Sequence, residues 1–186
     1  DKTKVSIVHD NHCRLCDNVT HALANLLNKT GHVECMVDFW CTKEMAVRGM
    51  RFYEDMIKEC DKFIVVCTKD GKRMRDTNDQ KAGPYNFMLN MLLGRMLHQN
   101  DSNLEVFPVY FDISSHDDVP LFLSTQRSYA LPSNVQNLCS ALCCKNNVCN
   151  GNEMAQKINE LNAAIKIMGQ NHKVYGKSNF TKTTSL

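Results

Sequence analysis

The sequence predicts an α/β fold, and three observations lead to this prediction. First, residues 63–67 form an apolar run, Phe-Ile-Val-Val-Cys, with no polar alternation. A strand that is covered by helices on both faces needs such a run, because both of its sides are buried. Second, residues 33–39 alternate in polarity, as expected for a strand with one wetter face. Third, four side chains recur between these segments at helical spacing: Met50, Tyr53, Ile57 and Cys60. Together they predict a strand–helix–strand unit.

Similar patterns recur along the rest of the chain. Strands are expected at residues 4–9, 33–39, 62–68, 104–111 and 127–131. Helices are expected at residues 12–28, 46–60, 84–96, 135–142 and 152–168. This alternation predicts a flavodoxin-like, doubly wound, five-stranded and mainly parallel sheet with helices on both faces. In such sheets the functional groups usually lie at the carboxyl ends of the strands.

Two segments depart from the regular pattern. Pro108 removes one backbone donor from the strand at 104–111, which favours an edge position or a bulge. Residues 169–186 have few apolar anchors, so we expect a loose tail after a single domain formed by residues 1–168.

Composition excludes several classes of function. A chain of 186 residues with 43% hydrophobic content can bury one sizeable core, which predicts one domain. Its net charge of +2 gives little attraction to nucleic acid or to a membrane surface. No apolar run approaches the ~18 residues of a membrane helix, and no signal-peptide pattern opens the chain. Because the chain begins almost inside its first strand, we expect it to be part of a longer protein.

The ten cysteines are expected to be reduced. Cys35, Cys60 and Cys67 fall on predicted inward faces, where thiols act as small apolar side chains. A domain of this size with a real core has little need of disulfides, which favours a reducing compartment. Four Asn-x-Ser/Thr sequons argue the other way, but such triplets arise by chance. They start at Asn18, Asn28, Asn100 and Asn179.

Cys13 and Cys16 have the Cys-x-x-Cys spacing of a redox or zinc motif at the start of a predicted helix, whose dipole could lower a thiol pKa. Zinc needs a second pair of ligands, and the other cluster of cysteines lies far along the chain without a suitably spaced His: Cys139, Cys143, Cys144 and Cys149. We favour buried or incidental thiols over redox or metal chemistry, and assign no metal ligand, cofactor-binding residue or cofactor.

The segment 69–83 is the main candidate for a partner-binding site. It is polar and charged, and is expected to be a long exposed loop; a loop of this length in a compact α/β domain is often functional. Trp40, at the end of the predicted strand 33–39, is equally well explained as a core residue or as an interface anchor. The candidate partner-binding residues are Trp40, Lys43, Glu44, Lys69, Asp70, Lys72, Arg73, Arg75, Asp76 and Lys81.

Several segments, taken in order, resemble a SEFIR domain, the intracellular module of interleukin-17 receptors and of their cytosolic adaptor. SEFIR domains are relatives of the Toll/interleukin receptor (TIR) domain. The matching segments include Lys-Val-Ser-Ile-Val-His-Asp at 4–10, Val-Asp-Phe-Trp at 37–40, Phe-Pro-Val-Tyr-Phe-Asp at 107–112, Asp-Asp-Val-Pro at 117–120 and Arg-Ser-Tyr-Ala-Leu-Pro at 127–132. The resemblance covers about residues 4–143. It departs after the first strand, where His9-Asp10-Asn11-His12 replaces the usual aromatic residue or Ser.

The resemblance implies a TIR-like fold and a non-enzymatic signalling role on the cytoplasmic side of the plasma membrane. The implied partner is another SEFIR domain, in an adaptor or co-receptor, or a second copy of this one. Any membrane attachment would be through a transmembrane segment outside this chain. Details around Trp40 and the Asp-Asp-Val-Pro segment look more like a receptor than the cytosolic adaptor, which remains the alternative. The resemblance also places partner contacts in the region 69–83 and the helix that follows.

An enzymatic alternative comes from TIR relatives that cleave NAD with a Glu after the third strand. From Asp61 to Asn103 this chain contains no Glu. A catalytic carboxylate would have to be Asp76 or Asp79, in a segment expected to be mobile, where a geometry within hydrogen-bond reach is hard to hold. The turn after the first strand is also not rich in glycine, and a glycine-rich turn is what lets phosphates approach backbone amides. We therefore expect no catalytic residues.

Overall fold

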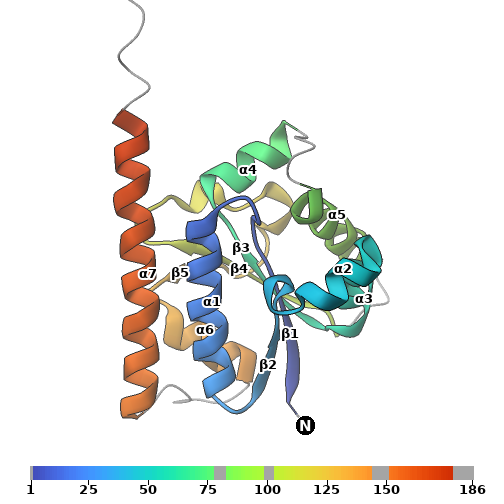
Figure 1. Ribbon diagram of the computed structural model, residues 1–186, viewed down its shortest axis with the longest axis horizontal. Helices are drawn as coiled ribbons and strands as arrows, with labels where there is room; N and C mark the ends of the chain where they lie inside the picture. The colour runs from blue at the N-terminus through green and yellow to red at the C-terminus, as the bar shows by residue number, and fades with distance from the viewer. Residues whose placement is uncertain (1, 78–82, 99–102, 144–150, 178–186) are drawn as a thin grey trace, which may run out of the picture.

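A computed structural model describes residues 2–77, 83–98, 103–143 and 151–177. Its centre is one sheet of five parallel strands in the order β2-β1-β3-β4-β5 (Figure 1). The strands are β1 (Thr3–Val8), β2 (Val33–Met36), β3 (Lys62–Val66), β4 (Glu105–Phe111) and β5 (Tyr129–Leu131). The predicted α/β, flavodoxin-like architecture is confirmed, and the sheet is parallel throughout.

Helices cover both faces of this sheet (Figure 1). One face carries α1 (Arg14–Lys29), α6 (Val135–Cys143) and α7 (Asn152–Lys177). The other carries α2 (Thr42–Arg48), α3 (Met50–Glu59) and α5 (Gly83–Leu97). A further helix, α4 (Lys69–Asp76), lies above the carboxyl ends of the strands, and three short 3-10 helices complete the described fold. These are η1 (Asp38–Trp40), η3 (His116–Asp118) and η4 (Leu121–Leu123).

Strand β3 lies at the centre of the core. Ile64 and Val66 belong to the apolar cluster under α1, α6 and α7, whereas Phe63 and Val65 belong to the cluster under α3 and α5. Successive strand residues point to opposite faces, so an unbroken apolar run places hydrophobic side chains in both clusters. The role predicted for residues 63–67 is confirmed.

Three predicted element boundaries were wrong. The predicted helix 46–60 is two helices, α2 and α3, separated by Gly49, whose φ of 55° a residue with a Cβ rarely adopts. The strand expected at 33–39 ends at Met36 and leads into η1. The expected loop 69–83 contains α4, because Thr68 caps the helix and Met74 is buried against the core.

Pro108 led us to expect an edge position or a bulge for its strand. The edge position was wrong, because β4 lies inside the sheet, between β3 and β5. The register explains why proline is tolerated there. Pro108 pairs with Val65 of β3, whereas β5 pairs only with residues Val109 to Phe111. At Pro108 the strand therefore has a ladder partner on one side alone, and a missing N–H on the other side costs no strand pairing.

Helix α7 continues nine residues past Met168, the end expected from the sequence, through the start of the predicted tail. It packs along α1, and among its residues up to 171, whose side chains the structure describes, four are buried: Met154, Leu161, Ile165 and Met168. Near its end Gly169 lies so close to Ile113 that an added Cβ would be 2.6 Å from the Ile113 Cδ1 atom. The division into a domain 1–168 and a loose tail stays a prediction. Among the described helices, none is long and apolar enough to cross a bilayer.

Candidate functional site

Helix α4 holds most of the charged residues predicted to bind a partner. The Thr68 side chain accepts a 3.0 Å hydrogen bond from the Gly71 amide and caps the helix. At Gly71 a Cβ would lie 3.2 Å from the Tyr85 hydroxyl oxygen, so the helix starts in close contact with α5. Gly71 and Met74 are the buried positions of α4. The remaining side chains of α4 are at least partly accessible, which leaves one charged face toward solvent.

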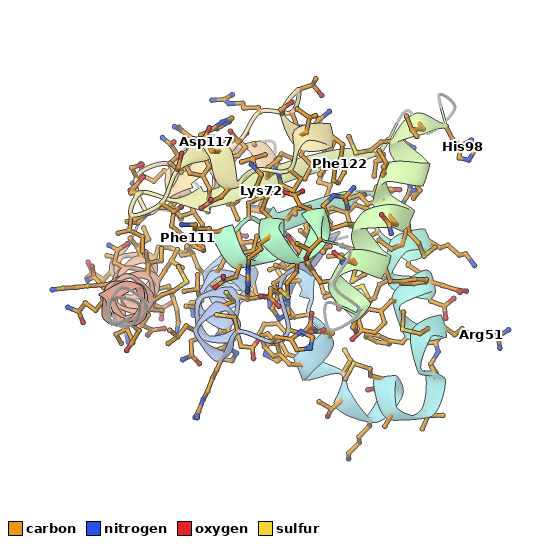
Figure 2. All side chains as sticks on the ribbon, turned by 90° about the horizontal axis from the view of Figure 1, so that it is seen from above. Arg51, Lys72, His98, Phe111, Asp117 and Phe122 are labelled. Carbon is orange, nitrogen blue, oxygen red and sulfur yellow. The ribbon has the colours of Figure 1, made fainter. Side chains whose placement is uncertain are left out.

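The charges of α4 divide into two groups. Lys72 donates a hydrogen bond to the Asp117 carbonyl, and the Arg75 guanidinium lies 4.5 Å from the ring centre of Phe122. Figure 2, viewed from above, shows Lys72 beside these two residues of η3 and η4. These two cations therefore brace α4 against the segment before β5. Lys69 and Asp76 are exposed, and so is Arg73, which forms a 3.7 Å ion pair with Asp70 on the same helix.

Leu121 adds an apolar group to this region. It precedes Phe122, which Arg75 covers, and 87% of its surface is exposed. Such a side chain adds apolar area to a surface that is otherwise charged. We call Lys69, Arg73, Asp76 and Leu121 the α4 surface. Sequence reasoning missed Leu121, although its neighbours in the Asp-Asp-Val-Pro segment drew attention to this stretch.

The other predicted partner-binding residues lie elsewhere. Trp40 belongs to η1, and Lys43 and Glu44 are exposed on α2, so none of the three is at a strand end. In both views α2 lies apart from α4. The structure thus does not bring the two predicted groups onto one surface. Lys81 lies outside the described residues, as does Asp79.

Trp40 is held by ring contacts to His21 of α1 and to Phe39 of η1. Its Nε1–H donates a 3.0 Å hydrogen bond to His21 Nδ1, and its ring meets those of His21 and Phe39 edge-on at 5.6 and 6.0 Å. It remains 38% exposed. One side of Trp40 therefore anchors η1 to α1 and the other faces solvent, and its role as an interface anchor stays a prediction.

A buried polar network fixes η1 at the carboxyl ends of β1 and β2. His9 Nε2 lies 3.0 Å from Asp17 Oδ1 and 3.8 Å from Asp38 Oδ1. Asp38 also accepts hydrogen bonds from the Phe39 amide, the Asn11 side chain and the Tyr53 hydroxyl. Burial, with the nearby Asp38 carboxylate, raises the pKa of Tyr53 well above its usual value. Sequence reasoning missed this network, although polar residues directly after two neighbouring strands could have indicated it.

This network is satisfied within the protein rather than directed at a substrate. Asp38 has three protein donors, and Asp10, also buried, accepts the His12 amide hydrogen bond at 3.0 Å. Its role is to hold the turn after β1 and η1 in place. In the parts of the chain that the structure describes, no group of three or more His, Cys, Asp or Glu side chains could hold a metal ion.

A pocket of about 650 Å³ lies at the amino-terminal edge of the sheet, among residues that begin β1, β3 and β4. Ion pairs cross it, from Lys4 to Glu59 at 3.6 Å and from Lys62 to Glu105 at 2.6 Å. Flavodoxin-like sheets bind ligands at the opposite edge, at the carboxyl ends of the strands. The pocket is a solvated rim with paired charges, and its place in the fold does not match that of a cofactor site.

A family model for the SEFIR domain matches residues 3–142. The chain belongs to the SEFIR family. SEFIR domains are TIR-like signalling modules that interact with other domains of SEFIR or TIR type. Among curated proteins, none matches the chain significantly. The resemblance found in the sequence is therefore confirmed at the level of the family.

Two solved structures show the same fold. The SEFIR domain of interleukin-17 receptor B is 16% identical, with a TM-score of 0.56 over 76% of this chain and 95% of that one. A prokaryotic SEFIR domain is 19% identical, with a TM-score of 0.53 over 81% of this chain and 98% of that one. Helix α7, at Asn152–Lys177, lies beyond the residues that the family model matches.

Proposed function

We propose that this SEFIR domain is a non-enzymatic module of an interleukin-17-type receptor, on the cytoplasmic side of the plasma membrane, which recruits an adaptor through a like-with-like SEFIR contact. The observation that carries the proposal is the α4 surface, where exposed charges of both signs lie on a helix above the carboxyl ends of the strands, and that helix contacts the segment that carries the exposed Leu121. Mixed charges suit orientation and register against a charged partner, and Leu121 adds exposed apolar area.

The bracing of α4 refines the set of residues that contact the partner. Lys72 and Arg75 are engaged by Asp117 and Phe122, so their replacement would disturb the position of the helix. Lys69 and Arg73 can instead reach a partner without breaking a contact to another element. We therefore place the partner contacts on Lys69, Arg73, Asp76 and Leu121, and assign positioning roles to Lys72 and Arg75.

The test is a double charge reversal, Lys69→Glu with Arg73→Glu, assayed by pull-down and titration against cognate SEFIR domains. Binding should weaken by at least about tenfold at low salt, and less at high salt, because salt screens exposed charges. Lys2→Glu with Lys166→Glu is the matched control, since it makes the same change in charge at two exposed positions away from α4. A folded Lys69/Arg73 variant that binds as tightly as the wild type would move the interface to Trp40 and α2.

The receptor assignment rests on the segments that resemble the receptor branch, and the cytosolic adaptor is the alternative. Reading the gene upstream of this chain separates the two. A hydrophobic span of ~20 residues before the domain indicates a receptor, whereas a ubiquitin-ligase segment in the same protein indicates the adaptor.

The enzymatic alternative is NAD cleavage of the TIR-related kind. Asp76, one of the two carboxylates that could serve, is exposed on the last turn of α4. In that position the carboxylate is open to solvent, whereas acid–base catalysis favours a site from which water is excluded. The purified domain should not cleave NAD above a heat-killed control. Turnover that is lost in an Asp76→Asn or Asp79→Asn variant would establish the enzymatic alternative instead.

A further inference from the structure

Cys13 and Cys16 lie together at the start of α1. Cys13 is the N-cap of the helix, and its Sγ atom accepts a 3.4 Å hydrogen bond from the Cys16 amide. This hydrogen bond holds the Cys13 thiol against the backbone of Cys16. Their accessibility differs, because Cys13 is partly exposed whereas the Cys16 side chain is 1% exposed. An accessible thiol thus lies directly over a buried one.

The local backbone brings these two residues within bonding range. On a helix surface, positions three apart have Cβ atoms about 5–6 Å apart. Cys13 lies just outside the helix, but the 3.4 Å between its Sγ atom and the Cys16 amide nitrogen shows a similar proximity. A disulfide needs Cα atoms about 4.4–6.8 Å apart and Cβ atoms about 3.5–4.5 Å apart, so a small adjustment suffices. Cys13 has an extended conformation (φ −105°, ψ 100°), and its carbonyl accepts the first helical hydrogen bond, from the Asp17 amide. The adjustment therefore falls on the backbone that precedes this carbonyl.

We propose that Cys13 and Cys16 form a reversible redox site, which a low-molecular-weight disulfide of the glutathione class converts from a dithiol into an intramolecular disulfide. This inference goes beyond the partner-binding function and does not depend on it. Cys13 acts as the attacking thiol because it is the accessible one. Cys16 acts as the resolving thiol because it is shielded from bulk solvent and in contact with Cys13.

The reaction has two exchange steps. In the first, the Cys13 thiolate attacks one sulfur of glutathione disulfide, the glutathione S–S bond breaks, and one glutathione thiolate leaves. In the second, Cys16 loses its proton to water and attacks the Cys13 sulfur, which releases the second glutathione thiolate. The protein dithiol is oxidised by two electrons, and one glutathione disulfide is reduced to two glutathione thiols.

The electrostatics of the pair fit these roles. The hydrogen bond from the Cys16 side chain, aided by the Cys16 and Leu15 amides, lowers the pKa of Cys13 to about 6. In the reduced pair, the interaction with Cys13 and burial raise the pKa of Cys16 far above its usual range. The first of these causes is lost when Cys13 enters the mixed disulfide, and Cys16 can then give up its proton for the second step. Stabilising the Cys13 thiolate stabilises the reduced pair, so its disulfide is easily reduced. The site is therefore a dithiol under reducing conditions and responds when the glutathione pool becomes oxidised.

Trypsin makes the product simple to identify. Cleavage after Lys4, Arg14 and Lys29 places the two cysteines on separate peptides, residues 5–14 and 15–29, neither of which has another cysteine. The native domain is incubated with glutathione disulfide, quenched in acid, alkylated, digested and examined by mass spectrometry. We expect the two peptides to be linked, and the link to disappear when excess reduced glutathione is added before the quench.

Three variants separate the roles of the thiols. Cys13→Ala should abolish the linked product, and Cys16→Ala should stop at glutathione attached to Cys13. Cys41→Ala, which removes another partly exposed cysteine, should leave the link unchanged. In the wild-type domain at pH 7, Cys13 should react with iodoacetamide at least about tenfold faster than Cys41. Unlinked peptides 5–14 and 15–29 after oxidation, or equal alkylation rates of Cys13 and Cys41, would overturn the proposal.

Discussion

At the scale of single residues, Val65 gives the most direct test of the core. It is fully buried in β3, between Val8 of β1 and Pro108 of β4. Val65→Asp places an unpaired carboxylate in this site and should lower the free energy of unfolding by several kcal/mol, out of a typical total of about 5–15 kcal/mol. Denaturant unfolding measures the change. Val47→Asp, at a position 87% exposed, is the control and should change stability little. Equal effects of the two substitutions would refute the central position of β3.

The buried thiols predict how stability depends on pH. Burial raises the pKa of Cys35 and of Cys60 to about 12. Above pH 9 the unfolded chain loses these protons while the folded chain keeps them, so the unfolded state binds fewer protons. The free energy of unfolding should therefore fall as pH rises from about 9 toward 12. Unfolding in urea at pH 8 and pH 10.5, with reductant present, measures the fall. A Cys35→Ala, Cys60→Ala double variant should show a smaller one; an identical fall would contradict the assignment.

At the scale of elements, α4 shows what sequence patterns can and cannot predict. Its residues are charged and contain one large apolar side chain, Met74, so periodicity gave no helix signal. The helix depends on the Thr68 cap and on contact with Tyr85, which lies on another element. Strand β3 was predictable because its signal is local, a run of apolar residues. Likewise the charges of Lys72 and Arg75 identified them as candidate partner-binding residues. Their contacts with η3 and η4 could not be predicted, because those elements lie far along the chain.

The cap of α4 can be tested by itself. Thr68→Ala removes the acceptor for the Gly71 amide and should cost about 1 kcal/mol of stability. Thr77→Ala changes the same residue type at the other end of the helix, where the hydroxyl donates to the Arg73 carbonyl, and should cost less. Because α4 carries the proposed partner surface, the Thr68 variant should also bind a SEFIR partner more weakly. Calorimetric melting and the pull-down measure the two effects, and a Thr77 variant that loses more of both would contradict the role of the cap.

At the scale of the whole molecule, α7 covers an apolar part of the core that is formed by the family-matched residues. Its four buried side chains belong to the apolar cluster over α1, although α7 lies beyond residue 142. Truncation after residue 143 should therefore expose the apolar face of α1 and reduce both solubility and melting temperature. A chain that ends at residue 177 is the control and should melt like the full chain. A truncated chain that stays monomeric in size-exclusion chromatography and melts unchanged would show that α7 is dispensable.

The position of Trp40 has a practical consequence for every binding experiment on this domain. It is the only tryptophan of the chain, it is partly open to solvent, and its indole is hydrogen-bonded to a histidine on a different element. Its fluorescence therefore reports on one defined place, the junction of η1 with α1. A partner that docks on α4 should leave the emission maximum where it is, whereas one that docks over η1 and α2 should shift it to shorter wavelength. The native protein thus carries an optical label that distinguishes the two surfaces without chemical modification.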